Sequence, residues 1–210
     1  MKKYFGIVLL ISITFSCQGQ SNSNVERNVG GPCQDCESVL DFQRLNIQPK
    51  STDTLPGFDN NEPKLKITGN VFQKDGKTPA ENVILYIYQT DRNGIYLAGD
   101  QAFGWEETHG QYRAWLKTGK DGKFTFYSFR PAPYPNVQEP EHIHIYVKEP
   151  NTIPYYIDSY FFESDTLLTD EKNLALKNRG GSGIIKLKMK NGIWTAHRDI
   201  TLGLNIPDYK

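Results

Sequence analysis

Four side chains of this 210-residue chain have the types and spacing of a metal site, namely Tyr96, Tyr134, His142 and His144. Successive side chains of a β-strand point to opposite faces, so His142 and His144 would face the same way while Ile143 turns into the core. Two imidazoles on one face of one strand provide half of a metal site. Two phenols nearby would complete it with hard, anionic oxygen donors, which favour Fe(III) over Zn(II).

The same residues also have a simpler interpretation. A His-x-His pair on an exposed strand more often belongs to an ordinary polar face than to a metal site. The chain contains 12 tyrosines, so two of them near a histidine pair need no special explanation. The pattern therefore raises the hypothesis of a metal site, and the hypothesis depends on whether the four side chains converge in the fold.

The segments that would position these residues are short, β-branched and aromatic, and they are separated by Gly, Pro, Asn and Asp. We expect strands at residues 66–72, 82–88, 112–117, 123–129, 141–148 and 155–162. Prolines at positions 131, 133 and 135 exclude a regular strand there and place Tyr134 in an extended loop.

The C-terminal part has a different pattern. We expect a short helix through about residue 177, capped by Thr169 or Asp170, and then a hairpin of residues 184–190 and 193–202 around Asn191-Gly192. Many short strands with Gly and Pro turns predict an all-β fold. We expect an antiparallel β-sandwich over residues 63–210, with an extended N-terminal arm, a short C-terminal helix and a hairpin.

The first 17 residues have the features of an export signal. Lys2 and Lys3 precede an apolar stretch over residues 5–15 that is too short to span a membrane, and Ser16-Cys17 follows at once. A small residue before a cysteine at this place is typical of bacterial lipoproteins, in which Cys17 would carry the lipid. We expect an exported protein of the periplasm or cell envelope, attached to the membrane only through this anchor. The alternative is an ordinary secretory signal.

The other two cysteines, Cys33 and Cys36, lie in residues 18–62, which we interpret as a polar tether followed by an arm on the domain. A pair in an oxidising compartment predicts a disulfide. A thioredoxin-like redox motif is the alternative, although no strand-then-helix pattern surrounds it. Lys+Arg and Asp+Glu both number 24, and no basic stripe stands out, which argues against nucleic acid as a partner. The sequence indicates no oligomeric state.

Several of these segments together resemble the intradiol ring-cleavage dioxygenases. The elements most typical of that family are Gly94-Ile95-Tyr96, Pro133-Tyr134-Pro135 and His142-Ile143-His144, in this order. The resemblance extends over about residues 66–165 and includes the segments at 67–71, 75–76, 79–91, 118–124, 130–135 and 141–145. It implies the sandwich fold of that family, which is also transthyretin-like.

The resemblance implies a non-haem Fe(III) cofactor held by Tyr96, Tyr134, His142 and His144, with Tyr134 as the ligand that leaves when substrate arrives. It implies that a catecholic ring and O2 are the substrates and that the ring opens between its hydroxylated carbons to a muconate-type diacid. Two departures stand out. Glu139-Pro140-Glu141 replaces the Arg-Pro-Ala that usually precedes the first histidine, and a carboxylate would repel a dianionic catecholate. A Thr-Gln pair on the later strand is also missing.

Arg113 and Arg130 are the candidates to replace the missing arginine as catalytic residues. His109, between Thr108 and Gly110, is expected in a loop near the mouth of the site or simply in solvent. Two other functions remain open. One is a lipid-anchored module that binds iron or catecholates without ring cleavage. The other is a purely structural transthyretin-like sandwich, in which the four candidate ligands would not converge.

Overall fold

The computed structural model describes Met1 and residues 26–210. Cys17 and the apolar stretch before it lie outside the described residues. Among the described residues, no helix is long and apolar enough to cross a bilayer.

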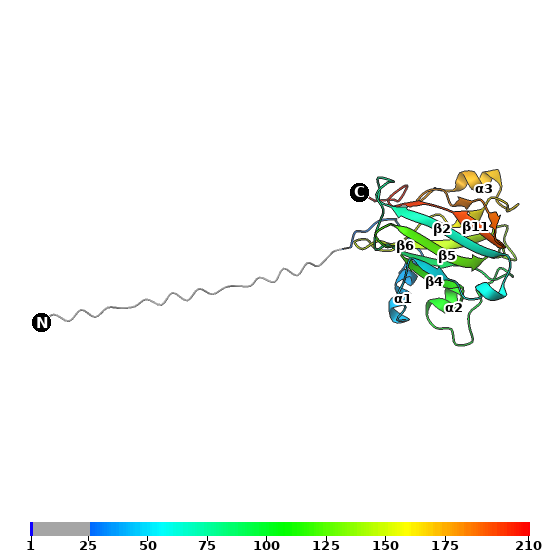
Figure 1. Ribbon diagram of the computed structural model, residues 1–210, viewed down its shortest axis with the longest axis horizontal. Coiled ribbons are helices and arrows are strands. Elements are labelled where there is room, and N and C mark those ends of the chain that lie inside the picture. Colours follow the sequence, from blue (N-terminus) through cyan, green and yellow to red (C-terminus); the bar gives the residue numbers. More distant parts are fainter. Residues whose placement is uncertain (2–25) are drawn as a thin grey trace.

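Two six-stranded sheets pack face to face and form a β-sandwich (Figure 1). The first sheet has the order β1-β5-β2-β11-β10, with β12 beside β2, and the second has the order β4-β3-β6-β8-β9, with β7 beside β6. The strands of the first sheet are β1 (Thr52–Thr54), β5 (Lys123–Phe129), β2 (Lys64–Phe72), β11 (Ile193–His197), β10 (Lys188–Lys190) and β12 (Ile200–Thr201). The strands of the second sheet are β4 (Arg113–Lys117), β3 (Ile84–Tyr88), β6 (His142–Lys148), β8 (Tyr160–Phe162), β9 (Ile184–Ile185) and β7 (Tyr155–Tyr156).

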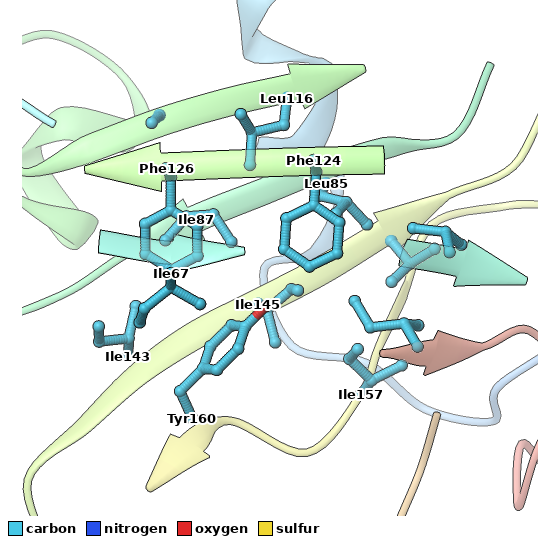
Figure 2. Close-up of a cluster of buried hydrophobic side chains, with 14 of the residues drawn as sticks. Ile67, Leu85, Ile87, Leu116, Phe124, Phe126, Ile143, Ile145, Ile157 and Tyr160 are labelled. Atoms are coloured by element: carbon cyan, nitrogen blue, oxygen red, sulfur yellow. The ribbon is translucent and has the colours of Figure 1, made fainter. Parts of the chain in front are cut away.

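The core lies between the sheets and consists of the inward-facing residues of both (Figure 2). Strand β2 shows the alternation clearly, because Leu65 and Ile67 are fully buried while Lys66 and Thr68 lie on the outer face. Phe124 and Phe126 of β5 meet Ile143 and Ile145 of β6 across the core, and all are almost completely buried. The expected sandwich is therefore confirmed.

Several details differ from the prediction. The sheets are mixed, since β1 runs parallel to β5, β11 and β12 run parallel to β2, and β9 runs parallel to β8. The strand expected at 155–162 is two strands, β7 and β8, separated at Ile157-Asp158-Ser159. The first arm of the C-terminal hairpin is also divided: β9 joins the second sheet, whereas β10 pairs with β11 in the first sheet across Asn191-Gly192. The second arm is divided into β11 and β12.

Helices lie outside the sandwich. They are η1 (Cys36–Leu40), α1 (Asp41–Arg44), η2 (Phe58–Asn60), α2 (Trp105–His109) and α3 (Asp170–Ala175). The expected cap of α3 is confirmed, because the side chain of Thr169 accepts a hydrogen bond from the backbone N–H of Lys172.

The arm is more structured than the sequence predicts. Besides η1 and α1 it adds β1 to the first sheet, and it covers the outer face of β3, β4 and β6. Cys36 and Val39 pack there against Tyr86, Trp115 and Tyr146. Strand β3 is consequently buried along its whole length on both faces.

Candidate metal centre

The histidine pair lies at the start of β6, on the outer face of the second sheet. Ile143 between them is fully buried in the core, as the alternation of side chains along a strand predicts. The two Nε2 atoms, of His142 and His144, are 3.0 Å apart.

Tyr96 lies in the loop that follows β3. The carboxylate of Asp91 shapes this loop by accepting hydrogen bonds from the backbone N–H groups of Asn93 and Ile95. Gly94 between them has a φ of 78°, a conformation that favours glycine.

Tyr134 lies in the proline-rich loop between β5 and β6, and this loop packs directly on the Tyr96 loop. Thr90 Oγ1 donates a hydrogen bond to the carbonyl of Ala132 at 2.8 Å, and the N–H of Ala132 donates to the carbonyl of Asp91 at 3.0 Å. A Cβ atom at Gly94 would lie 2.0 Å from the carbonyl oxygen of Pro133. Glycine is therefore what allows the two tyrosine loops to approach.

The four side chains converge. Tyr96 Oη is 2.5 Å from Tyr134 Oη and 2.8 Å from His144 Nε2. Tyr134 Oη lies 3.3 Å from His142 Nε2 and 3.4 Å from His144 Nε2. Donor atoms bound at about 2.0–2.1 Å to one ion in a tetrahedral arrangement lie roughly 3.3 Å apart. The three separations of 3.0–3.4 Å among Tyr134, His142 and His144 match this spacing, whereas the two shorter ones at Tyr96 are hydrogen-bond distances that would lengthen around an ion. The convergence contradicts the purely structural interpretation.

The imidazole nitrogens are in the state that a metal requires. His142 Nδ1 donates to the carbonyl of Pro140 at 2.7 Å, because a carbonyl can only accept, so Nε2 keeps its lone pair toward the cluster. Burial lowers the pKa of His142, and burial together with the neighbouring His142 lowers the pKa of His144 well below its ordinary value. Both rings are therefore neutral at neutral pH.

The pKa values of the two phenols shift upward, whereas those of the imidazoles shift downward. Burial raises the pKa of Tyr96 and of Tyr134, so without a cation both oxygens keep their protons. A highly charged ion at the centre of the cluster would favour the phenolates instead. Among the described residues, no group of three or more His, Cys, Asp and Glu could hold a metal. The two phenol oxygens are thus indispensable to this donor set, and their hardness favours Fe(III).

Solved structures similar to this chain include dioxygenases. One is the dioxygenase domain of a dioxygenase–carbohydrate-binding fusion protein from Streptomyces sp. SirexAA-E, with a TM-score of 0.55 and 21% identity over 74% of this chain and 89% of that one. Another is 3-chlorocatechol 1,2-dioxygenase from Rhodococcus opacus 1CP, with a TM-score of 0.54 and 18% identity over 70% of this chain. The chain has the intradiol dioxygenase fold.

A third similar structure is the hydroxyquinol 1,2-dioxygenase from Pseudomonas putida DLL-E4, with a TM-score of 0.55 and 17% identity over 87% of this chain and 68% of that one. The match spans 62% of the length of the chlorocatechol enzyme. No protein-family model matches the sequence, and no curated protein matches it either. The likeness confirms the fold that the sequence resemblance implies.

The two arginines considered for catalysis lie elsewhere in this intradiol dioxygenase fold. Arg113 is buried and pairs with Asp41 at 3.1 Å and with Glu106 at 3.5 Å. Arg130 pairs with Glu141 and donates to Ser164 at 3.2 Å. In the part of the chain that the structure describes, neither guanidinium group contacts any of the four donors. Both guanidinium groups are instead paired with nearby carboxylates. Glu139, in contrast, lies close enough to raise the pKa of Tyr134 further, after the larger effect of burial.

A layer of stacked aromatic side chains packs against His144, and the sequence did not predict this layer. The ring of Tyr88 stacks on His144 on one side, with centroids 4.4 Å apart, and on His109 on the other, at 4.0 Å. The hydroxyl groups of Tyr88 and Tyr146 are 2.8 Å apart. His109 is therefore not at the mouth of the site or in solvent. It is 3% exposed at the end of α2, and burial lowers its pKa to about 4.

The arm forms one wall of a pocket beside the centre. The pocket has a volume of about 210 Å³ and is lined by Cys33, Gln34, His144, Ile145, Tyr146, Tyr156, Ile157 and Ser159. Cys33 and Cys36 form a disulfide with Cα atoms 5.7 Å apart, and Gln34 between them accepts a hydrogen bond from the Tyr146 hydroxyl at 3.2 Å. The disulfide loop thus lies against the site, and the spacing of the two cysteines gave no indication of this.

Proposed function

We propose that this protein is a non-haem ferric dioxygenase that opens a catecholic ring with O2 between its two hydroxylated carbons, giving a muconate-type diacid. The observation that carries the proposal is the convergence of two phenol oxygens and two imidazole nitrogens, each of which lies within 3.4 Å of at least two of the others. Fe(III) held there would act as a Lewis acid toward a bound catechol and make its ring reactive toward O2.

The residues of the centre have distinct roles in this proposal. The hydrogen bond from His142 to Pro140 fixes the orientation of one imidazole, and stacking on Tyr88 fixes the other. Tyr134 corresponds to the leaving ligand of the family that the chain resembles, and in that role its Oη would accept the proton of an incoming catechol hydroxyl. Tyr96 Oη, 2.5 Å from Tyr134 Oη, would be within reach of a hydrogen bond to that phenol.

We place the substrate ring in the pocket beside His144, the one of the four donors that lines it. Tyr146, Tyr156 and Ile157 give it apolar and aromatic walls, and such walls exclude water from a reacting ring. Ser159 Oγ, 3.4 Å from His144 Nδ1, provides a polar group at its inner edge.

The charged residues around the centre favour a second candidate function, which is the binding of iron or catecholates without ring cleavage. Glu139 contributes negative charge near Tyr134, and neither Arg113 nor Arg130 reaches the donors. Losing one stabilising contact to developing negative charge costs roughly a hundredfold in rate. Under this alternative the protein binds a catechol at its iron and leaves it intact.

Oxygen uptake separates the two candidates. The iron-loaded protein should consume O2 and catechol in equal amounts over a panel of substituted catechols, and the diacid should accumulate. His142→Ala should lose iron, and Tyr134→Phe should weaken the visible phenolate-to-iron absorption. A coloured protein that binds catechols without any uptake of O2 would support binding alone.

Export and lipid attachment through Cys17 remain part of the proposal. Their support is the Ser16-Cys17 sequence after an apolar stretch and the disulfide of Cys33 and Cys36, which suits an oxidising compartment. Cys17→Ala should move the protein from the membrane fraction to the soluble fraction of the producing cell. An unchanged distribution would contradict the anchor.

A further inference from the structure

A second concave site lies on the opposite outer face of the sandwich, away from the candidate metal centre. It is a groove of about 630 Å³, three times the volume of the pocket beside His144. Four lysines line it, namely Lys66, Lys186, Lys188 and Lys190. Its other lining residues are Thr68, Tyr127, Asn191, Ile193, Thr195, Ala196 and His197, so no carboxylate is among them.

The register of the first sheet aligns these side chains in a row across the strands. Lys188 of β10 pairs with Thr195 of β11, Thr195 pairs with Lys66 of β2, and Lys66 pairs with Tyr127 of β5. Paired residues share one face, and neighbouring strands lie about 4.8 Å apart, so Lys188 and Lys66 are separated by roughly 10 Å. The row therefore places two lysines about 10 Å apart with the hydroxyl-bearing Thr195 between them.

The positive charge of the groove is largely uncompensated. Lys186 pairs with Glu163 at 2.9 Å, and His197 pairs with Asp199 at 2.9 Å. Within residues 26–210, Lys66, Lys188 and Lys190 form no ion pair. The whole chain has a formal net charge of zero, so this concentration of lysines is a local feature, and like charges in one groove favour an anionic ligand.

Protection of an exposed edge explains only part of the arrangement. Lysines on an edge strand such as β10 prevent pairing with other chains, which would account for Lys188 and Lys190. Lys66, however, lies on β2 between β5 and β11, where no edge needs protection. Its ammonium group lies 5.5 Å from the centre of the Tyr127 ring, over the groove.

We propose that this groove binds an acidic oligosaccharide. Carboxylates of the sugar rings would pair with the lysines. Ring hydroxyls would donate to Oγ1 of Thr68 and Thr195, whose own hydroxyls donate to the carbonyls of Ala196 and Lys188, and would meet the side chain of Asn191. A protein partner is disfavoured because the groove lacks the large apolar anchors of protein interfaces. A nucleic acid is disfavoured because Tyr127 is the only Phe, Tyr or Trp among the lining residues and Lys66 already covers its ring.

The test is calorimetric titration of the full chain with a tetramer of galacturonic acid at low salt. Lys66→Gln combined with Lys188→Gln should weaken binding about tenfold, because one exposed ion pair contributes at most a factor of about five. Lys74→Gln combined with Lys120→Gln is the matched control. It removes the same charge from two exposed turns outside the groove and should leave the affinity unchanged.

Four results would overturn the proposal, of which the first three concern the sugar itself. They are equal binding of a neutral glucose tetramer, equal affinity in the two double variants, and the absence of binding at millimolar ligand. Tighter binding of a tetra-aspartate peptide or an oligothymidylate would also refute it and would assign the groove to another polyanion. Iron content should be the same in all variants, which separates this test from that of the metal centre.

Discussion

The replacement of Gly94 by alanine tests how the candidate metal centre is assembled. Gly94 has a φ of 78° and lies where the loops of Tyr96 and Tyr134 touch. Two effects follow from adding one methyl group. The left-handed backbone conformation costs about 1–2 kcal/mol in any residue with a Cβ, and the new Cβ would meet the carbonyl oxygen of Pro133 at 2.0 Å.

The second effect has a defined size. Contacts of a Cβ below 3.0 Å essentially never occur, so the two loops must separate by at least 1.0 Å. Metal–ligand distances tolerate only about 0.2 Å. A shift of this size therefore removes Tyr96 or Tyr134 from the centre, and we expect Gly94→Ala to lose most of its bound iron or most of its phenolate-to-iron absorption.

Gly192→Ala is the matched control. Gly192 has a φ of 80°, and a Cβ there would meet nothing within 4 Å. This variant should lose the same 1–2 kcal/mol of stability and keep the iron. The assay is iron content and visible absorbance of folded protein, with urea unfolding of both variants. Gly94→Ala protein that retains the iron and colour of the Gly192→Ala control would refute the reasoning.

Three further predictions concern stability. Arg113→Met should lower the free energy of unfolding by about 2 kcal/mol, because Asp41 loses the hydrogen bond from one buried arginine and keeps its pair with Arg44. Unfolding in urea measures this, and loss of iron in the variant would instead place Arg113 at the centre. The pKa of His109 is about 4 against an ordinary 6.5, so the unfolded chain takes up a proton first as the pH falls from 6.5 to 4. That uptake should remove about 2–3 kcal/mol of stability, and His109→Gln should flatten this part of the pH profile, whereas an unchanged profile would contradict the assignment. Removal of iron by a chelator should lower the free energy of unfolding by about 4 kcal/mol relative to protein in free iron a thousandfold above the dissociation constant, and equal melting curves would show that no folded-state site was filled.

The sequence carried enough information for the sandwich and for the four donors. Alternation of apolar and polar side chains predicted β2 and β5 well, since each has one face in the core and one outside. Convergence of the donors followed from the order of three short motifs typical of a known family. Periodicity predicted only that His142 and His144 share a face.

Features that depend on contacts between distant segments were not predictable in this way. The arm covers Tyr86 and Trp115 with only a few apolar residues, such as Val39, so its pattern is too weak to indicate helices or a strand. His109 follows a polar segment and is buried because the arm and Trp105 enclose it. The lysine groove does have a signal in the sequence, because Lys186, Lys188 and Lys190 alternate along one segment, but alternation alone does not place Lys66 beside them.

Resonance Raman spectroscopy of the purified protein, together with its iron content, tests the central claim most directly. If two phenol oxygens and two imidazoles hold one ferric ion, the protein should contain one iron per chain and show tyrosinate vibrations enhanced at its visible absorption band. Tyr96→Phe and Tyr134→Phe should each remove part of these vibrations. A colourless protein that remains free of iron after reconstitution, or iron bound without any tyrosinate signal, would contradict the claim.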